Sequence, residues 1–353
     1  MIELVRQPDG RQRDAIRALM ASPDCNERVC GEHDPAWLDV LRGGLKHDTS
    51  VLLSWRGNEL VGTLPLSLTR SPLFGRHLVS LPYVNRAGLL TADDGVAESL
   101  IGHAAEIAEQ QDVRYLELRH HGQAFESKQF THTRSTKVRM VLDLPSDHDA
   151  LWPSYKAKVR NQVRKAEQAG LEIRFGGEEL LAGFYSVFAT NMRDLGTPVY
   201  PRRLFGAMLH HLADRCEIAL VSVESIPIAG AILIHDHVGP ACTSQVPSAS
   251  CLRGYNDLNA NMWMYHKLLE RAIERGAQAF DFGRSSEGSG TYRFKKQWGA
   301  LPQPTPWQVR LRRGELDAVR PDHPRYQRRI ERWQKLPVWV TKAIGPAIVR
   351  GIP

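Results

Sequence analysis

The sequence lacks the features that would place it in a membrane or secreted class. No apolar run approaches the length of a membrane span, and the first residues lack the apolar core of a signal peptide. The five cysteines form an odd, scattered set, which is typical of reduced thiols and not of a disulfide framework. We therefore expect a cytoplasmic protein.

The sequence also lacks the patterns that mark common catalytic and metal sites. It contains no nucleophile elbow of the Gly-x-Ser-x-Gly type, no Walker loop and no dinucleotide-binding fingerprint. His235 and His237 share one face of a strand, but no third ligand follows at a spacing that suits a metal ion. We therefore expect no metal site and no tightly bound cofactor.

Charge and length are more informative. The 353 residues include 46 Lys and Arg against 39 Asp and Glu, which gives a formal net charge of +7. A basic balance favours an anionic partner, such as nucleic acid, a nucleotide-linked sugar or an acidic membrane surface. The length exceeds that of one ordinary core and predicts two domains.

The predicted elements follow the same order in both halves of the chain. An amphipathic helix over 93–110 precedes a buried strand over 115–118, and a long helix over 258–275 precedes a strand over 279–282. Helices and antiparallel strands come before each of these pairs. This repetition predicts an α/β (α+β) fold built from tandem copies of one unit, each with a mixed, mostly antiparallel sheet flanked by helices.

We place the first domain at residues 1–145 and the second at 146–312. The second domain is predicted to open with a helix over 154–169, on which Lys156, Arg160 and Arg164 repeat every four residues. Such a basic face is either solvated or binds a phosphate or RNA.

A basic amphipathic tail, residues 313–353, follows the second domain. Tyr326, Ile330 and Trp333 share one helical face in this tail. We expect that face to pack on the body of the protein. The alternative is a surface helix that contacts anionic lipid.

The stretch 279–299 carries the clearest functional signal. After its strand comes a predicted glycine-rich loop with Gly288 and Gly290, and then an aromatic and cationic segment over 292–298. Glycines allow backbone amides to approach a ligand closely, and α/β folds place ligands just after strands. A glycine-rich loop alone would be a flexible connection, but aromatic residues beside Arg284 and Lys295 favour a site for an anionic group.

The runs at 280–285 (FDFGRS) and 288–299 (GSGTYRFKKQWG) resemble the closing motif of FemAB-like proteins. These are N-acyltransferases built from GNAT-type domains, and the resemblance is greatest to the branch associated with exopolysaccharide and PEP-CTERM/exosortase systems. The resemblance implies that the tandem units are GNAT-type domains. It also implies direct attack of an amine on an activated carbonyl, which requires no enzyme nucleophile.

The resemblance assigns roles to residues of the closing motif. Lys295 would neutralise charge on the donor or the intermediate, with Phe294 packing against it and Tyr292 and Arg293 as neighbours. Asp281 is the candidate proton acceptor or orienting carboxylate, and a structural aspartate at a strand end is the alternative. The other predicted substrate-binding residues are Arg284, Tyr200, Gly288 and Gly290, and the predicted anion-binding residues are Arg253, Lys156, Arg160 and Arg164.

The expected function is transfer of an acyl or aminoacyl group to an amine of a cell-envelope or exopolysaccharide precursor. The donor would be acyl-CoA or aminoacyl-tRNA, and the acceptor an anionic small molecule or a lipid- or nucleotide-linked sugar. Expected partners also include tRNA and the cytoplasmic face of the inner membrane, through peripheral contact. The alternative is a non-catalytic GNAT-fold protein that binds an anionic glycan or RNA.

Overall fold

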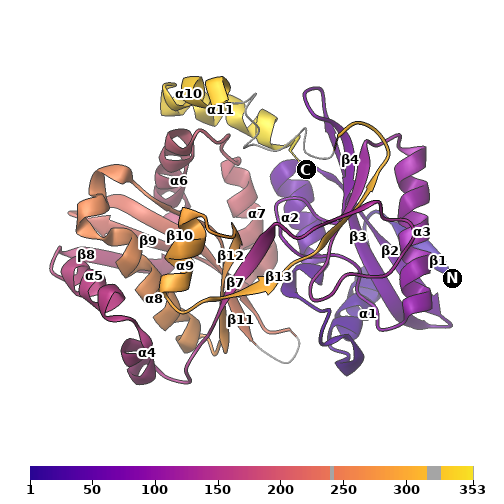
Figure 1. Cartoon of the computed structure of the whole chain (residues 1–353), viewed down its shortest axis with the longest axis horizontal. Coiled ribbons are helices and arrows are strands. Elements are labelled where there is room, and N and C mark those ends of the chain that lie inside the picture. The colour runs from indigo at the N-terminus through magenta and orange to yellow at the C-terminus, as the bar shows by residue number, and fades with distance from the viewer. Residues whose placement is uncertain (239–241, 316–326, 353) are drawn as a thin grey trace.

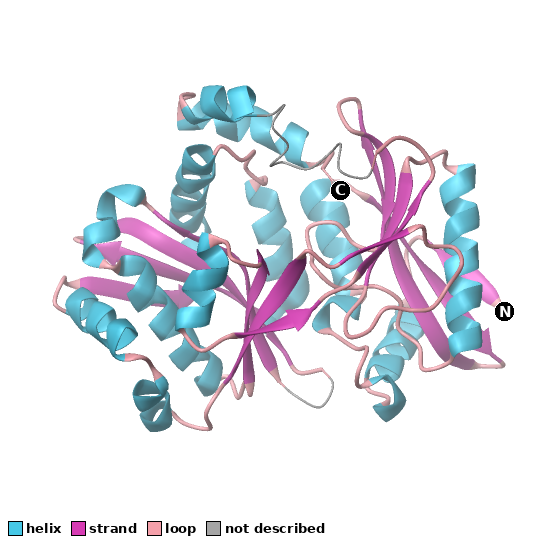
Figure 2. Cartoon of the chain, viewed as in Figure 1, coloured by secondary structure: helices cyan, strands magenta, loops and turns pink. Residues whose placement is uncertain are grey.

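The computed structural model describes residues 1–238, 242–315 and 327–352. Two seven-stranded mixed sheets lie side by side, and each carries helices on both faces (Figures 1 and 2). The predicted architecture of two units, each with a mixed and mostly antiparallel sheet flanked by helices, is therefore confirmed.

The strands of the first sheet are β1 (Ile2–Val5), β2 (Asp48–Arg56), β3 (Glu59–Ser71), β4 (Gly75–Val79), β5 (Tyr115–Arg119), β6 (His132–Arg134) and β14 (Trp307–Leu311). Their order is β1-β2-β3-β4-β5-β14-β6, and only the β4–β5 pair is parallel. Helix α3 (Asp94–Gln110) covers one face of the sheet, while α1 (Gly10–Met20) and α2 (Ala36–Leu45) pack on the other.

Helix α3 shows how the sequence fixes these elements. The side chain of Asp93 caps its N-terminus by accepting hydrogen bonds from the amides of Gly95 and Val96, at 2.9 and 3.0 Å. Leu100 and Ala104, four residues apart, are fully buried against the sheet. The predicted helix over 93–110 is confirmed.

The strands of the second sheet are β7 (Lys137–Asp143), β8 (Leu171–Gly176), β9 (Cys216–Val223), β10 (Ile226–Asp236), β11 (Thr243–Cys251), β12 (Ala279–Ser286) and β13 (Leu301–Pro304). Their order is β13-β7-β12-β11-β10-β9-β8, with a single parallel pair between β11 and β12. Helices α6 (Leu181–Leu195) and α7 (Arg202–Leu212) cover one face. Helices α4 (His148–Ser154), α5 (Ala157–Glu167) and α8 (Ala260–Glu274) cover the other.

The two halves of the chain exchange strands. β7 precedes the predicted boundary at residue 145, yet it pairs between β13 and β12 in the second sheet. β14 follows the second sheet in sequence but inserts between β5 and β6 of the first. The apolar residues of β7, such as Val138 and Met140, do not indicate in the sequence which sheet they belong to. The boundaries of 1–145 and 146–312 stay a prediction, and the sheet pairing crosses them.

Helices α2 and α7 join the two units. Gly44 of α2 lies so close to α7 that a side-chain carbon there would come within 2.8 Å of the Leu204 Cα atom. Trp37 and Leu41 of α2 lie in the same buried cluster as Phe205 of α7. The interior therefore continues from one sheet to the other.

The helix predicted over 154–169 is confirmed as α5, although it begins three residues later than predicted. Tyr155 has extended backbone angles (φ −75°, ψ 144°) and separates α4 from α5. Its ring is buried, and its hydroxyl lies 3.1 Å from Nδ1 of His266 on α8. Burial of this tyrosine outweighs continuation of the helix.

The predicted glycine-rich loop is shorter than expected. β12 continues to Ser286, and the aromatic and cationic segment forms helix α9 (Gly290–Gln297). Ser289 caps this helix by accepting a hydrogen bond from the Tyr292 amide at 3.1 Å. The segment is therefore held rigidly after the strand.

The tail packs on the body, as expected. Its helices are α10 (Gln327–Gln334) and α11 (Val338–Val349), which lie against α6 (Figure 1). Ile330 of α10 packs over Gly196. A side-chain carbon at Gly196 would come within 2.4 Å of the Cγ2 atom of Ile330. His47 of the first unit lies 3.0 Å from the backbone carbonyl of Arg350. Tyr326 lies outside the described residues.

Candidate functional site

A cleft of about 590 Å³ lies between the two sheets. Val246, Phe282 and Tyr200 line it from the second unit, while Tyr83 and Arg119 line it from the first. Trp307 of the exchanged strand β14 also lines the cleft, and its indole nitrogen donates a hydrogen bond to the carbonyl of Asn85 at 2.9 Å. Both halves of the chain therefore build the walls.

The cleft begins where β11 and β12 separate. Their parallel pairing ends at Gln245 and Asp281, and the residues that follow on each strand line the cleft. The pairing of β12 with β7 shifts between Asp281 and Arg284, around Gly283 at φ +78°. Only glycine adopts this backbone conformation at little cost. The irregularity brings five successive residues of β12, 282–286, to the cleft.

Cations dominate the charged residues of this cleft. Arg119, Lys137, Arg284 and Lys295 line it, and the described lining residues include no aspartate, glutamate or histidine. Arg119 is neutralised by Glu117, whose Oε1 lies 2.9 Å from its Nη2. The remaining charge suits an anionic ligand.

Arg284 stacks on Trp307 and has no ion pair with a described carboxylate. Its guanidinium carbon lies 3.4 Å from the centroid of Trp307, and that of Arg119 lies 3.9 Å from the same centroid. The Nε atom of Arg284 is buried and has no hydrogen-bond acceptor among the described residues. Burial, with the nearby charge of Arg119, lowers the pKa of Arg284 from 12.5 to about 9. A bound anion would accept a hydrogen bond from Nε and would balance the charge of the guanidinium group.

Lys295 is held in place by the strand that precedes it. Its Nζ donates hydrogen bonds to the carbonyls of Gly283 and Arg284, each at 3.0 Å. A protonated amine has three hydrogens, so one remains for a ligand. Burial lowers the pKa of Lys295 from 10.5 to about 8, while Asp281 acts in the opposite direction. Lys295 is therefore charged at neutral pH but close to its titration range.

Hydroxyl groups complete the polar lining. The Oγ atom of Ser285 is buried and has no partner among the described residues. Tyr83 shares a hydrogen bond of 3.1 Å with Ser248. Burial raises the pKa of the Tyr200 and Tyr265 phenols, which therefore stay protonated and can donate hydrogen bonds.

Asp281 lies apart from this lining. Its Oδ1 accepts a hydrogen bond from the Gly283 amide at 2.8 Å, and its Oδ2 lies 3.6 Å from both Arg86 and Arg139. Burial raises its pKa. It does not line the cleft, so this geometry supports the structural alternative over the proton acceptor.

Of the other predicted substrate-binding residues, Tyr200 and Arg284 lie in the cleft with Lys295. Phe294 instead packs on Tyr265, with ring centroids 5.0 Å apart, and holds α9 against α8. Arg293 is exposed and donates a hydrogen bond to the Gly288 carbonyl. Tyr292, Gly288 and Gly290 do not line the cleft either, although their neighbours Ser289 and Thr291 do.

The predicted anion-binding residues are not brought to the cleft. Arg253 is exposed in a short 3-10 helix before α8. Lys156, Arg160 and Arg164 lie on or beside α5, on the side of the second sheet away from the first unit (Figure 1). Arg160 donates a hydrogen bond to the Tyr155 carbonyl, and the Arg164 guanidinium lies 5.4 Å from the Trp152 ring. The structure gives these four residues no shared site.

Arg119, Trp307 and Tyr83 were missed from the sequence. Arg119 ends a buried apolar strand, and a charge at that position was the one available signal. Trp307 carries no motif, because its role depends on the insertion of β14 into the first sheet.

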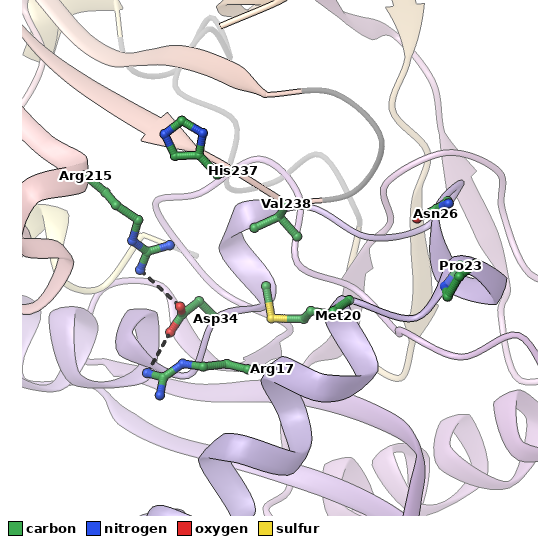
Figure 3. Close-up of a pocket in the computed structure, with 9 residues that line it drawn as sticks. Arg17, Met20, Pro23, Asn26, Asp34, Arg215, His237 and Val238 are labelled. Carbon is green, nitrogen blue, oxygen red and sulfur yellow. Dashed lines mark hydrogen bonds and ion pairs between the residues drawn. The ribbon is translucent and has the colours of Figure 1, made fainter. Parts of the chain in front are cut away.

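A second cavity of about 560 Å³ lies beside α1 and the end of β10 (Figure 3). Its charged residues neutralise one another: Asp34 lies 3.1 Å from Arg215 and 3.7 Å from Arg17. No group of three or more potential metal ligands occurs within residues 1–238, 242–315 and 327–352. The cleft, where no carboxylate of the described residues pairs with Arg284, is therefore the stronger candidate site.

Comparison with known proteins agrees with this fold. Residues 153–296 match the family model of the acetyltransferase (GNAT) domain, so this part of the chain is similar to GNAT-type acetyltransferase domains. This match supports an acyltransferase in general terms. No curated protein is detectably similar to the chain in sequence.

Three solved structures share the fold across most of the chain. FemX has a TM-score of 0.61 and 15% identity, over 87% of this chain and 96% of its own. A tandem GNAT protein from the clavulanic acid biosynthesis pathway has a TM-score of 0.59 and 14% identity, over 89% and 100%. The C-terminal domain of a putative lysylphosphatidylglycerol synthetase from Agrobacterium fabrum has a TM-score of 0.51 and 12% identity, over 84% and 91%.

Proposed function

We propose that the protein is an N-acyltransferase whose cleft binds an anionic donor or acceptor. The observation that carries this proposal is the pair of cations on β12 and α9: Arg284, which pairs with no carboxylate of the described residues, and Lys295, which is fixed by two carbonyls. The match of the second unit to the acetyltransferase (GNAT) domain supports the reaction class.

The reaction needs no covalent intermediate on the enzyme. The nitrogen of an acceptor amine attacks the activated carbonyl carbon, a C–N bond forms, and the bond to the leaving group breaks. Ser285 and Ser286 line the cleft, but no aspartate, glutamate or histidine of the described lining can act as their base, and Lys295 is mostly protonated at neutral pH. Catalysis then rests on positioning and charge stabilisation.

Lys295 is placed to stabilise the developing oxyanion. Its two hydrogen bonds to Gly283 and Arg284 fix the ammonium group before substrate binds, so little reorganisation is needed during the reaction. Tyr200 or Tyr265, both protonated, would donate a hydrogen bond to the leaving group. The proton lost by the amine passes to the leaving group or to solvent.

The acceptor that we favour is an amine on a cell-envelope or exopolysaccharide precursor, linked to a nucleotide or a lipid. The phosphate of such a precursor would pair with Arg284. Acyl-CoA and aminoacyl-tRNA are both candidate donors. FemX and the tandem GNAT protein share their fold with this chain.

A binding protein without turnover is the second candidate. The absence of any carboxylate or histidine from the described lining favours it, because no obvious proton acceptor faces the ligand. In that case the cleft would hold an anionic glycan or RNA.

A donor and acceptor screen tests the proposal. The protein is incubated with acyl-CoAs or charged tRNA and with nucleotide-linked amino sugars, and acylated product is measured by mass spectrometry. We expect product with wild type and with Lys296→Ala, an exposed neighbour outside the cleft, but not with Lys295→Ala. Ligand retention without product for every pair would favour the binding protein instead.

A further inference from the structure

We propose that the outward face of α11, together with the cations of α10, binds the surface of a bilayer that contains anionic phospholipid. The outward face consists of the exposed apolar residues Trp339, Ala343, Ile344 and Ala347. The exposed cations Lys342 and Arg350 flank it, and they also contact the Tyr185 ring and the Lys46 carbonyl. This binding does not depend on the acyl transfer proposed above.

The orientation of α11 is fixed by its inward face. Thr341, Gly345 and Val349, four residues apart, are buried against the body. At Gly345 a side-chain carbon would come within 2.9 Å of the Val199 backbone nitrogen, so the helix approaches the segment after α6 closely. The opposite side must therefore face outward.

The outward face is apolar where an ordinary surface helix is polar. The side chain of Trp339 is 74% exposed and that of Ile344 is 43% exposed. The exposed positions include no acidic residue. Tryptophan and aliphatic residues beside lysine and arginine are the composition of helices that lie in a membrane interface.

Charge extends this face along the tail. Residues 327–352 contain six basic residues and one acidic residue, Glu331. The basic residues are Arg328, Arg329, Arg332, Lys335, Lys342 and Arg350. Basic residues next to a membrane surface are attracted by anionic headgroups.

Charge also argues against the other occupants of this face. Two copies of the chain would bring like charges together, and a nucleic acid would leave Trp339 and Ile344 without apolar contacts. No described helix is long and apolar enough to cross a membrane. We therefore assign the face to peripheral contact with a bilayer.

Co-sedimentation with vesicles tests the inference on the full-length protein. Vesicles of phosphatidylcholine alone are compared with vesicles containing phosphatidylglycerol, at low and high salt. We expect binding to the anionic vesicles that weakens with salt. Trp339→Ser should weaken this binding about tenfold, since it removes a large apolar side chain from the interface.

The matched control is Leu4→Ser, which removes an apolar side chain that is 49% exposed on β1. It should leave binding unchanged, while Lys335→Glu combined with Lys342→Glu should weaken it at least tenfold. The melting temperature of Trp339→Ser should equal that of wild type, which separates loss of binding from loss of folding. Failure of wild type to sediment with anionic vesicles overturns the inference. So does an equal loss in Leu4→Ser, or a dimer that Trp339→Ser converts to monomer without any vesicle binding.

Discussion

Replacing Arg284 with methionine should make the protein more stable and its cleft less able to bind anions. Methionine is long enough to keep contact with Trp307, but it removes the charge. In the ligand-free protein this charge is partly desolvated, lies near Arg119 and has no paired carboxylate. Its removal should relieve an unfavourable interaction.

The size of the effect follows from the pKa. Its fall from 12.5 to about 9 corresponds to a cost on the order of 5 kcal/mol for keeping Arg284 charged in the folded protein. Part of the Arg284 side chain reaches solvent, which reduces this cost. Loss of stacking on Trp307 reduces the stability gained in the variant by roughly another 1 kcal/mol. We therefore expect the free energy of unfolding to rise by about 2 kcal/mol in Arg284→Met.

Urea denaturation in phosphate-free buffer measures this difference, with and without added pyrophosphate. Lys296→Met is the matched control, because Lys296 carries the same charge, is exposed and does not line the cleft. It should change stability by less than about 0.5 kcal/mol. Pyrophosphate should stabilise wild type and Lys296→Met but not Arg284→Met. If Arg284→Met is less stable than wild type, or is stabilised equally by pyrophosphate, Arg284 is not an unpaired anion-binding cation.

The remaining predictions concern the lysine, the buried aspartate and the tail. Lys295→Ala should lower turnover about a hundredfold with little change in melting temperature; wild-type turnover would remove this lysine from the reaction. In wild type, kcat/KM should fall as pH rises through about 8, because the ammonium form of Lys295 is lost. Lys295→Arg should move this fall to higher pH, and a pH profile identical to that of wild type would contradict the charged role. Asp281→Asn should lower the free energy of unfolding by about 3 kcal/mol, because it leaves Arg86 and Arg139 without their shared carboxylate. An unchanged midpoint in urea denaturation would show that this pairing is unimportant. Deletion of residues 327–353 should lower the melting temperature by uncovering α6, so an unchanged value would mean that the tail packs without stabilising the body.

Local patterns in the sequence were sufficient for most elements. The helix at 93–110 and the strand at 115–118 follow from apolar periodicity and a capping aspartate. Both signals come from residues that lie close together in the sequence. The closing motif likewise indicated Lys295 and Arg284, which share the cleft. These signals lie within a few residues of the groups that they predict.

What the sequence did not predict depends on contacts between distant segments. Asp281 looked like a cleft residue because it precedes the glycine-rich stretch, but Arg86 and Arg139 hold it elsewhere. The helix predicted from residue 154 begins only after Tyr155, because the ring of Tyr155 fits beside His266, more than a hundred positions away. Trp307 reaches the cleft only because its strand joins the first sheet.

The exchange of β7 and β14 has a consequence for how the chain folds. A fragment that begins at residue 146 would lack the central partner of both β12 and β13, and a fragment that ends at 145 would lack the strand between β5 and β6. Neither half can complete its hydrogen-bonded ladder alone, and each would present open edges that favour aggregation. The pairing of β5 with β14 joins residues almost two hundred positions apart, so it must form late, after a large loop has closed. We therefore expect the two repeats to unfold as one cooperative unit.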